Sequence, residues 1–348
     1  MNSKSNKIYL GFFGLLLLVV LYLGVLSFTK YFHNEPVRET TNATSAADPY
    51  PVKIGQPEMP DHFKVAFIAD QGLNDNSKKV LELIKSEKAQ MVLHDGDFDY
   101  ADNPDAWAKQ TDDILGKNFP YLAVIGNHDI KEWNKYQPKI AERLSNVPGM
   151  VCKGDIGVEG GCLFHGVNFA FSSPGITLPN TNYDHAKILA IRLAQSPTPW
   201  NVCAWHKDQR AMQLGDKEDE VGWAVYDTCR RGGAIIATGH EHSYERTYLM
   251  DNFETPSVVS TSSTLTLEKG KSFAFVSGLG GESIRPQKRD GSWWAAAYTA
   301  TQRAKPGALF CTFGVTGTDG KTDSKKADCY FKDIGGKIVD TFSVVTAL

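Results

Sequence analysis

Five short polar clusters recur along this chain, and each follows an apolar run. They are Asp70-Gln71-Gly72, Gly96-Asp97-Phe98-Asp99-Tyr100, Gly126-Asn127-His128-Asp129, a lone His206 and Gly239-His240-Glu241-His242. Their carboxylates, amide, imidazoles and phenol are donors that suit Fe, Mn or Zn rather than soft metals that prefer thiolates. Two such ions held close together are a common device for displacing the leaving group of a phosphate ester. The clusters therefore predict a two-metal hydrolytic centre.

The runs before the clusters have the length and composition of short buried strands. The expected strands are Phe63–Ala69, Met91–His94, Leu122–Ile125, Val202–Trp205 and Ala234–Thr238. Each cluster thus comes just after the carboxyl end of a strand. In open α/β sheets the loops at these ends converge on one edge, where ligands bind. We therefore expect the five clusters to meet.

Helical periodicity separates several of these strands. Helices are expected over Ser77–Ala89, with Ser77 as the N-cap, over Pro104–Lys117 and over Asp219–Arg231. After Arg246 the helical pattern fades, and segments such as Phe273–Val276, Ala308–Phe313 and Ile338–Val345 indicate antiparallel strands. The chain is therefore expected to be an α/β protein with a β-rich second half.

The clusters, taken in order, resemble the five blocks of the calcineurin-like metallophosphoesterases, and more narrowly those of the purple acid phosphatases. The wider superfamily begins with Asp-Xaa-His, whereas Asp70-Gln71-Gly72 lacks the His. The purple branch supplies a Tyr instead, which Tyr100 matches, and Gly239–Arg246 resembles that branch's last block. The resemblance runs from about Phe63 to Tyr248 and implies a four-layer α/β/β/α sandwich.

The resemblance also implies roles for nine residues. Asp70, Tyr100 and His242 would bind Fe³⁺, Asn127, His206 and His240 would bind a divalent Fe, Zn or Mn ion, and Asp97 would bridge the two ions. A strong Lewis acid such as Fe³⁺ would make hydroxide from bound water, and this hydroxide would attack a phosphate monoester. His128 would contact the phosphate or protonate the leaving oxygen, and Asp129 would orient the His128 imidazole.

The sequence after His206 departs from the purple pattern, which usually has a Pro, a Tyr and often a second outer His. Lys207 is the candidate phosphate contact in their place, and a solvated loop lysine is its alternative. Asp70 could instead be a helix N-cap, and Tyr100 an ordinary half-buried aromatic residue. The pair Trp293-Trp294 either rims the cleft or belongs to the core.

Two other functions fit the same residues. One is a related phosphodiesterase or nucleotide hydrolase with a non-ferric metal pair. The other is a catalytically weak, membrane-tethered binding protein of the same fold. The predicted substrate is a small phosphate ester. Nucleic acid is not expected as a partner, because the net charge of the 348 residues is −3 and no basic run stands out.

The N-terminus predicts a membrane anchor. Ile8 to Phe28 is apolar and uncharged and has the length of a bilayer-spanning helix. Lys4 and Lys7 precede it, so residues 1–7 are expected in the cytoplasm. Residues 29–60 are expected to be a stalk, and 61–348 a lumenal or extracellular catalytic domain in a type II orientation. A cleaved signal peptide, which would release a secreted protein, is the alternative.

A sequon and six cysteines agree with a secretory route. Asn42-Ala43-Thr44 is an N-glycosylation sequon. Cys152 with Cys162, and Cys311 with Cys329, flank Gly-rich turns as hairpin disulfides would. Cys203 and Cys229 fall in a predicted strand and helix, where a third disulfide and two buried thiols are both open.

Overall fold

The computed structural model describes residues 59–348 apart from 180 and 317–319. The predicted anchor, the Asn42 sequon and nearly all of the predicted stalk lie outside the described residues. The chain divides into the units Met1–Thr44 and Ser45–Leu348, and the fold below is that of the second unit. Within the described ranges, none of the helices is both long enough and apolar enough to cross a bilayer.

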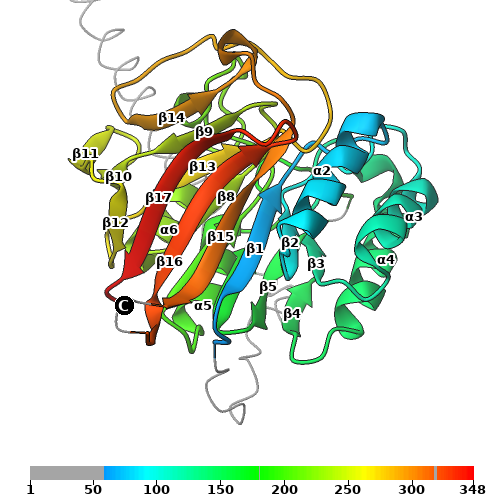
Figure 1. Ribbon diagram of the computed structural model, residues 1–348, viewed down its shortest axis with the longest axis horizontal. Helices are drawn as coiled ribbons and strands as arrows, with labels where there is room; N and C mark the ends of the chain where they lie inside the picture. Colours follow the sequence, from blue (N-terminus) through cyan, green and yellow to red (C-terminus); the bar gives the residue numbers. More distant parts are fainter. Residues whose placement is uncertain (1–58, 180, 317–319) are drawn as a thin grey trace, which may run out of the picture. The chain divides into compact units, whose positions relative to one another are not determined.

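Two mixed β-sheets lie at the centre of this unit (Figure 1). The first has the order β12 (Thr264–Leu267), β17 (Ile338–Thr346), β16 (Thr322–Asp333), β15 (Gly307–Thr316), β1 (Phe63–Ile68), β2 (Met91–His94) and β3 (Tyr121–Ala123). The second has the order β14 (Trp294–Tyr298), β9 (Tyr244–Thr247), β13 (Ala274–Ser277), β8 (Ile235–Thr238), β7 (Trp200–Ala204), β6 (Val167–Phe171), β5 (Glu159–Phe164) and β4 (Val151–Asp155). A separate ribbon pairs β10 (Leu249–Asn252) with β11 (Ser257–Ser260).

Helices cover the outer faces of both sheets. The first sheet is covered by α2 (Asp75–Ser86), α3 (Pro104–Leu115) and α4 (Trp133–Ser145), and the second by α5 (His185–Ala194) and α6 (Ala224–Gly232). One apolar core fills the space between the sheets, where Phe67 of β1 packs edge-to-face against Phe275 of β13. A second core lies between the second sheet and its helices. The layers therefore follow the α/β/β/α order that the resemblance implied.

The strands that precede the polar clusters are confirmed to within two residues at each end. β1 pairs in parallel with β2, and β2 with β3, while β7 pairs in parallel with β8 in the other sheet. The carboxyl ends of these strands consequently share an edge in each sheet. The β-rich second half is confirmed as well: the described residues after Arg246 contain strands and only a 3₁₀ turn at Ala300–Gln302.

Two predicted helix starts are wrong, and in both cases a polar side chain explains the shift. Helix α2 begins at Asp75, because the Asn74 side chain caps it by accepting from the Ser77 N–H at 3.0 Å. Helix α6 begins at Ala224 rather than at Asp219. The Asp219 carboxylate instead closes a turn by accepting from the N–H groups of Val221 and Gly222.

All six cysteines form disulfides. Cys152 lies directly opposite Cys162 in the β4–β5 hairpin, and Cys311 lies opposite Cys329 on β15 and β16, as predicted. Cys203 joins Cys229, which ties β7 to α6 and settles the question that the sequence left open. This third bond holds a covering helix to the strand that precedes His206.

Candidate metal centre

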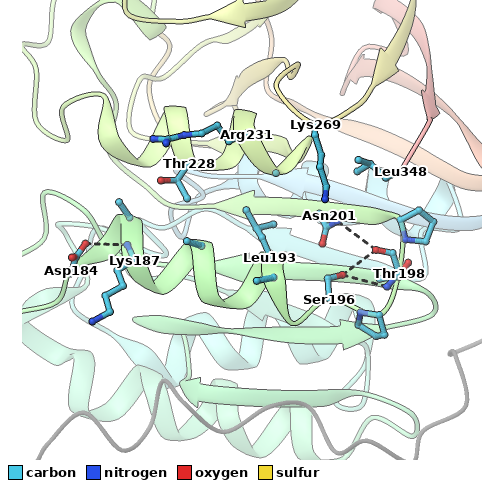
Figure 2. Close-up of a pocket in the computed structure, with 16 residues that line it drawn as sticks. Asp184, Lys187, Leu193, Ser196, Thr198, Asn201, Thr228, Arg231, Lys269 and Leu348 are labelled. Atoms are coloured by element: carbon cyan, nitrogen blue, oxygen red, sulfur yellow. Dashed lines mark hydrogen bonds between the residues drawn. The ribbon is translucent and has the colours of Figure 1, made fainter.

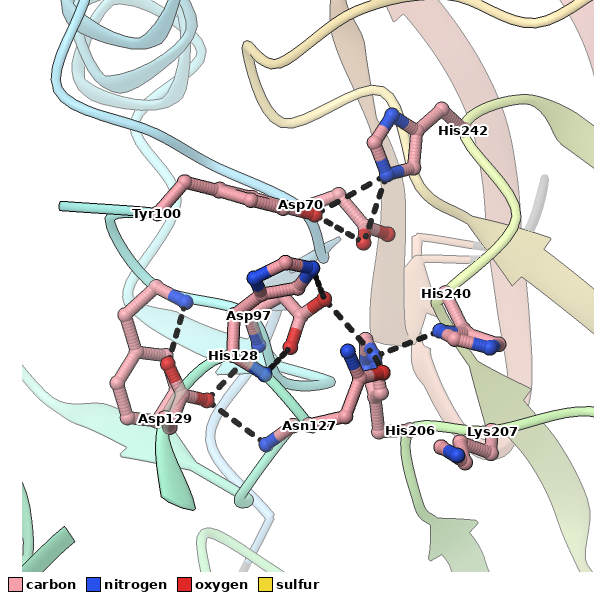
Figure 3. A network of polar contacts seen from close by, with 12 residues as sticks. Asp70, Asp97, Tyr100, Asn127, His128, Asp129, His206, Lys207, His240 and His242 are labelled. Carbon is pink, nitrogen blue, oxygen red and sulfur yellow. Dashed lines mark hydrogen bonds and ion pairs between the residues drawn. The ribbon is translucent and has the colours of Figure 1, made fainter. Parts of the chain in front are cut away.

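The seven predicted metal ligands meet at one edge of the sandwich (Figure 3). Their loops follow β1, β2 and β3 in the first sheet and β7 and β8 in the second. All seven fall into two groups of close contacts, three in the first group and four in the second. The structure thus brings together residues that lie as far apart in the sequence as Asp70 and His242.

The first group consists of Asp70, Tyr100 and His242. The Tyr100 hydroxyl donates to Asp70 Oδ1 at 2.7 Å and lies 3.1 Å from His242 Nε2. His242 Nε2 is 3.4 Å from the same Asp70 oxygen. Asp70 Oδ2 is buried and has no hydrogen-bond partner among the described residues. A buried carboxylate oxygen without a donor is a position that a cation would fill.

The second group centres on His206 Nε2. This nitrogen lies 3.2 Å from Asn127 Oδ1, 3.2 Å from Asp97 Oδ2 and 3.1 Å from His240 Nδ1. Asp97, His206 and His240 each offer one ligand atom, and these atoms lie within 4.8 Å of one another. One ion could therefore contact all three residues.

Each imidazole is also held from behind by an oxygen. His206 Nδ1 is 2.7 Å from the Asp95 carbonyl oxygen, His240 Nε2 is 2.6 Å from Glu220 Oε2, and His242 Nδ1 is 2.9 Å from the Ser283 carbonyl oxygen. Metal-binding histidines usually place the second ring nitrogen on such a partner, which fixes the tautomer and the ring orientation. The nitrogens left facing the centre are those described in the two groups above. The residues present thus fit metal ions.

The loops of the first sheet are fixed chiefly by hydrogen bonds from their backbone N–H groups to the Asp129 side chain. The Asp129 carboxylate accepts from the N–H groups of Gly126 at 2.7 Å and of Asp97 and Phe98 at 2.9 Å each. At Gly126 a side chain is excluded, because a Cβ there would lie 2.1 Å from Asp97 Oδ1. The Asp97 and Asn127 loops therefore hold each other in register.

Four of the seven predicted ligands have a left-handed backbone. The φ angles are 57° at Asp70, 61° at Asp97, 55° at Tyr100 and 67° at His240. This region costs an L-residue of order 1–2 kcal/mol, somewhat less for Asp. Such strain concentrates at functional sites, where the surrounding fold can hold it.

The electrostatics of the centre favour cations. Burial raises the pKa of Asp70, but the neighbouring His242 and His206 outweigh it, so the net pKa lies below its usual range. Burial would lower the pKa of His206, yet the Asp97 and Asp70 carboxylates raise it to about 9. Burial, followed by Asp70, raises the pKa of Tyr100, which is therefore a neutral phenol in the metal-free molecule. Metal binding would release protons from such groups.

The residues predicted to act on the substrate lie in different settings. The His128 side chain is 52% exposed, and its Nε2 is 4.0 Å from Asp97 Oδ2, so it is accessible to solvent beside the predicted ligands. The Asp129 oxygens are directed at backbone N–H groups, and no hydrogen bond joins this carboxylate to the imidazole of His128 in the described part of the chain. Lys207 forms an ion pair with Glu220, the carboxylate that also contacts His240.

Two cations that the sequence did not single out lie against the predicted ligands. Lys217 Nζ is 2.9 Å from His240 Nε2 and 3.1 Å from His240 Nδ1. Arg285 Nη2 is 3.3 Å from His242 Nε2, and its Nη1 donates to the His240 carbonyl at 3.1 Å. Each lies more than 20 residues from the histidine it contacts, outside every cluster, so only the tertiary structure reveals it. Together they provide positive charge beside the candidate centre.

A groove that contains none of the polar clusters lies elsewhere on the molecule. Its volume is about 950 Å³, and it runs along α5 and α6 near Leu193, Thr198, Arg231 and Leu348 (Figure 2). None of the predicted ligands lines it. The chemistry of the polar clusters is therefore separate from this groove.

A sequence model of the calcineurin-like phosphoesterases matches residues 63–244, just over half of the 348 residues. The chain belongs to this family. Among curated proteins, none matches the sequence significantly. The matched region contains the β1, β2, β3, β7 and β8 loops, and therefore all seven predicted ligands.

Solved structures share the fold. The purple acid phosphatase PPD1 of yellow lupin (Lupinus luteus) superposes with a TM-score of 0.59 at 15% identity, over 83% of this chain and 55% of the lupin chain. GAP50, the anchor in the inner membrane complex of Plasmodium, gives 0.53 at 13% identity, over 82% of this chain and 89% of its own. At these identities the likeness concerns the fold alone, and this chain spans little more than half of the lupin protein.

Proposed function

We propose that this protein hydrolyses phosphate monoesters at two metal ions, Fe³⁺ and a divalent Fe, Zn or Mn ion. The observation that carries the proposal is the convergence of seven donors whose three imidazoles are each held by an outer oxygen. The Tyr100 phenol in the first group supports Fe³⁺, because a hard trivalent ion can bind a phenolate. The resemblance to the purple acid phosphatases at Tyr100 and at Gly239–Arg246 supports the same choice.

When bound, the two ions would supply Lewis-acid activation of water and neutralise charge on the phosphate. The first ion would be held by Asp70, Tyr100 and His242, the second by Asn127, His206 and His240, and Asp97 would contact both. His128 is exposed beside Asp97 and would donate a proton to the leaving oxygen. The Asp129 carboxylate would act indirectly, because its hydrogen bonds fix the loops that carry Asp97 and Asn127.

Lys217 and Arg285 are the proposed phosphate contacts, in place of Lys207. The Lys207 ammonium is held by Glu220. Arg285 also has a carboxylate partner, since its Nη1 lies 3.3 Å from Glu241 Oε2, but its side chain is 35% exposed and its Nη2 lies 3.3 Å from His242 Nε2. A guanidinium can bind two phosphate oxygens at once and would stabilise negative charge that grows in the transition state.

The decisive experiment measures metal content, visible spectrum and phosphate release from an aryl phosphate on the same purified protein. We expect two metals per chain and hydrolysis that a chelator abolishes. Less than one metal per chain after careful purification, or no phosphate release from a metal-loaded sample, would overturn the proposal. A colourless but active enzyme with Zn or Mn would instead favour the related phosphodiesterase or nucleotide hydrolase with a non-ferric pair.

One observation favours a second candidate, a catalytically weak binding protein of the same fold. The Lys217 ammonium lies 3.1 Å from His240 Nδ1, the nitrogen that would bind the second ion. If Lys217 keeps this position in solution, the second ion is excluded. Protein that purifies without metal and stays inactive when Fe, Zn or Mn is added would support this candidate over the phosphatase.

We also propose that the domain is tethered to a membrane in a type II orientation, with 61–348 lumenal or extracellular. The uncharged run from Ile8 to Phe28 behind Lys4 and Lys7 supports the tether, and the sequon at Asn42 and the three disulfides support the compartment. Protease protection on intact microsomes tests it. The region around His62 should resist protease added from the cytoplasmic side until detergent opens the vesicle, and cleavage without detergent would exclude this orientation.

A further inference from the structure

A cavity of about 380 Å³ opens between the segments 209–213 and 289–294. Its walls include Gln213, Trp293 and Trp294, with the guanidinium-bearing Arg210 and Arg289 beside them. None of the seven predicted metal ligands, and neither Lys217 nor Arg285, lines it. The cavity is therefore distinct from the candidate metal centre.

The same two segments nevertheless lead to that centre. Gln213 Nε2 donates to the Lys217 carbonyl at 2.7 Å, and the Lys217 ammonium lies against His240. In the other segment, Arg289 donates through Nη1 to the Gly215 carbonyl at 2.7 Å, and Arg285 reaches His242. Gln213 and Lys217 are four positions apart in the chain, a span of at most about 14 Å for an extended chain. A single small ligand could thus touch both places.

The lining has aromatic faces and unsatisfied polar atoms. The rings of Trp293 and Trp294 lie 6.4 Å apart at an angle of 43°. Gln213 is fully buried, and its Oε1 has no hydrogen-bond partner among the described residues; the same holds for the indole Nε1 of Trp293. A buried polar atom without a partner costs about 1–3 kcal/mol, so these two atoms call for a physical explanation.

A ligand with matching chemistry would explain them. A flat ring could stack on an indole face, while a donor on its edge would satisfy the Gln213 oxygen and an acceptor would satisfy an indole or guanidinium N–H. A plain phenyl ring would leave these polar atoms unpaired. The nucleobases are the common rings that carry both a donor and an acceptor on one edge.

We propose that this cavity binds the planar, hydrogen-bonding ring of the substrate, of the chemical class of a nucleobase, while the ester phosphate lies at Lys217 and Arg285. The placement of the phosphate at Lys217 and Arg285 rests on the proposed function, whereas the placement of the ring in the cavity does not. The cavity is then a specificity site, and the preferred substrate is a nucleotide rather than a phosphate ester of a small alcohol.

The first test compares two substrates in matched variants. In Trp294→Leu, the ratio of kcat/KM for adenosine monophosphate to kcat/KM for glycerol 2-phosphate should fall about tenfold or more, because base stacking is worth about 1–3 kcal/mol. Trp294→Phe keeps an aromatic face and should recover most of the ratio. Trp223→Leu removes another half-buried indole outside the cavity and should leave the ratio as in wild type.

The second test needs no hydrolysis. Adenosine, which has no phosphate, should bind wild-type protein in a calorimetric titration and bind Trp294→Leu at least several-fold more weakly. If both esters are hydrolysed with an unchanged ratio and adenosine does not bind, the cavity assignment is wrong and the proposed function stands. If adenosine binds in this Trp294-dependent way but neither ester is hydrolysed, the proposed function is wrong and the ring site stands.

Discussion

The two sheets contribute different chemistry to the candidate centre. The predicted ligands on the loops after β1, β2 and β3 of the first sheet are all oxygen donors, namely Asp70, Asp97, Tyr100 and Asn127. The predicted ligands on the loops after β7 and β8 of the second sheet are all nitrogen donors, namely His206, His240 and His242. Both contact groups draw on both sheets, so each ion would be held across the interface between the layers.

The two sides are also positioned by different means. On the oxygen side, meaning the loops after β1, β2 and β3, the donors are positioned mainly through the backbone. Three of the four donors have positive φ, and Asp129 accepts from three N–H groups of the same loops. On the nitrogen side every imidazole is instead oriented by an oxygen behind it. Substitutions on the oxygen side should therefore remove an ion outright, and outer substitutions on the nitrogen side should weaken binding in steps.

The largest effect is expected from Asp97→Ala, because Asp97 is the one oxygen donor proposed to serve both ions. Activity should fall by more than about 10³-fold, beyond the 10–100-fold typical of outer partners, and both metals should be lost. Elemental analysis beside an aryl phosphate assay measures this. Asp113→Ala, at an exposed carboxylate on α3, is the control. Near-normal metal content in Asp97→Ala would break the assignment of a shared ligand.

Tyr100→Phe tests the oxygen side alone. The phenolate oxygen is removed while the ring and its packing beside His128 are kept, so the fold should survive. Iron-loaded wild type should show a visible charge-transfer band that the variant lacks, and the first ion should be lost or reduced more easily. An iron-loaded wild type without any such band, or one whose band persists in Tyr100→Phe, would show that Tyr100 does not bind iron.

The polar clusters could be located in the sequence because each follows a buried strand, and the resemblance to the purple acid phosphatases then assigned the donors within them. Strand ends are marked by local apolar runs, and parallel pairing brings their loops to one edge. The supporting contacts were not predictable in this way. Arg285 and Lys217 reach the histidines through long loops, and nothing in their own neighbourhoods distinguishes them from solvated cations.

The same distinction between local and distant signals explains the outcome for other elements. The two hairpin disulfides were predicted from a Gly-rich turn between Cys152 and Cys162 and from a Gly/Asp/Lys-rich loop between Cys311 and Cys329, whereas Cys203–Cys229 depends on how α6 packs on β7. Similarly, the spacing of apolar residues predicted that helix α2 exists but not where it begins. Its first residue is set by the Asn74 side chain, which caps the helix. Local patterns predicted the elements, and side-chain contacts between distant segments decided their ends and their partners.

A smaller effect is expected on the nitrogen side from Glu220→Gln. Glu220 Oε2 holds His240 Nε2 at 2.6 Å, and removing such a partner typically weakens metal binding 10–100-fold. The second ion should be lost to a competing chelator at lower chelator concentration, while the Tyr100-dependent band of the first ion persists. Glu218→Gln changes a more exposed glutamate of the same loop and serves as the control. Equal loss of both ions would contradict the separate support of the two sides.

The smallest effect concerns a carboxyl group that supports the second sheet without contacting the candidate ligands. Glu245 on β9 is fully buried, and its Oε1 accepts from the Leu214 N–H at 3.0 Å, in the loop that leads to Lys217. Burial raises the pKa of Glu245 from 4.5 to about 8. The folded state therefore favours the protonated form, so this stabilisation is complete below about pH 4.5 and is lost as the pH rises toward 8.

Glu245→Gln should remove that pH dependence, because the amide keeps an oxygen for the Leu214 N–H and cannot ionise. Relative to the variant, wild type should lose on the order of 3 kcal/mol of unfolding free energy between pH 5 and pH 8. Urea denaturation of both proteins at the two pH values, with disulfides intact, measures the difference. Glu82→Gln, at an exposed glutamate on α2, is the control, and its unfolding free energy should change with pH as that of wild type does. If Glu245→Gln also runs parallel, Glu245 is ionised when folded, and a charged rather than a neutral carboxyl supports the loop on the nitrogen side.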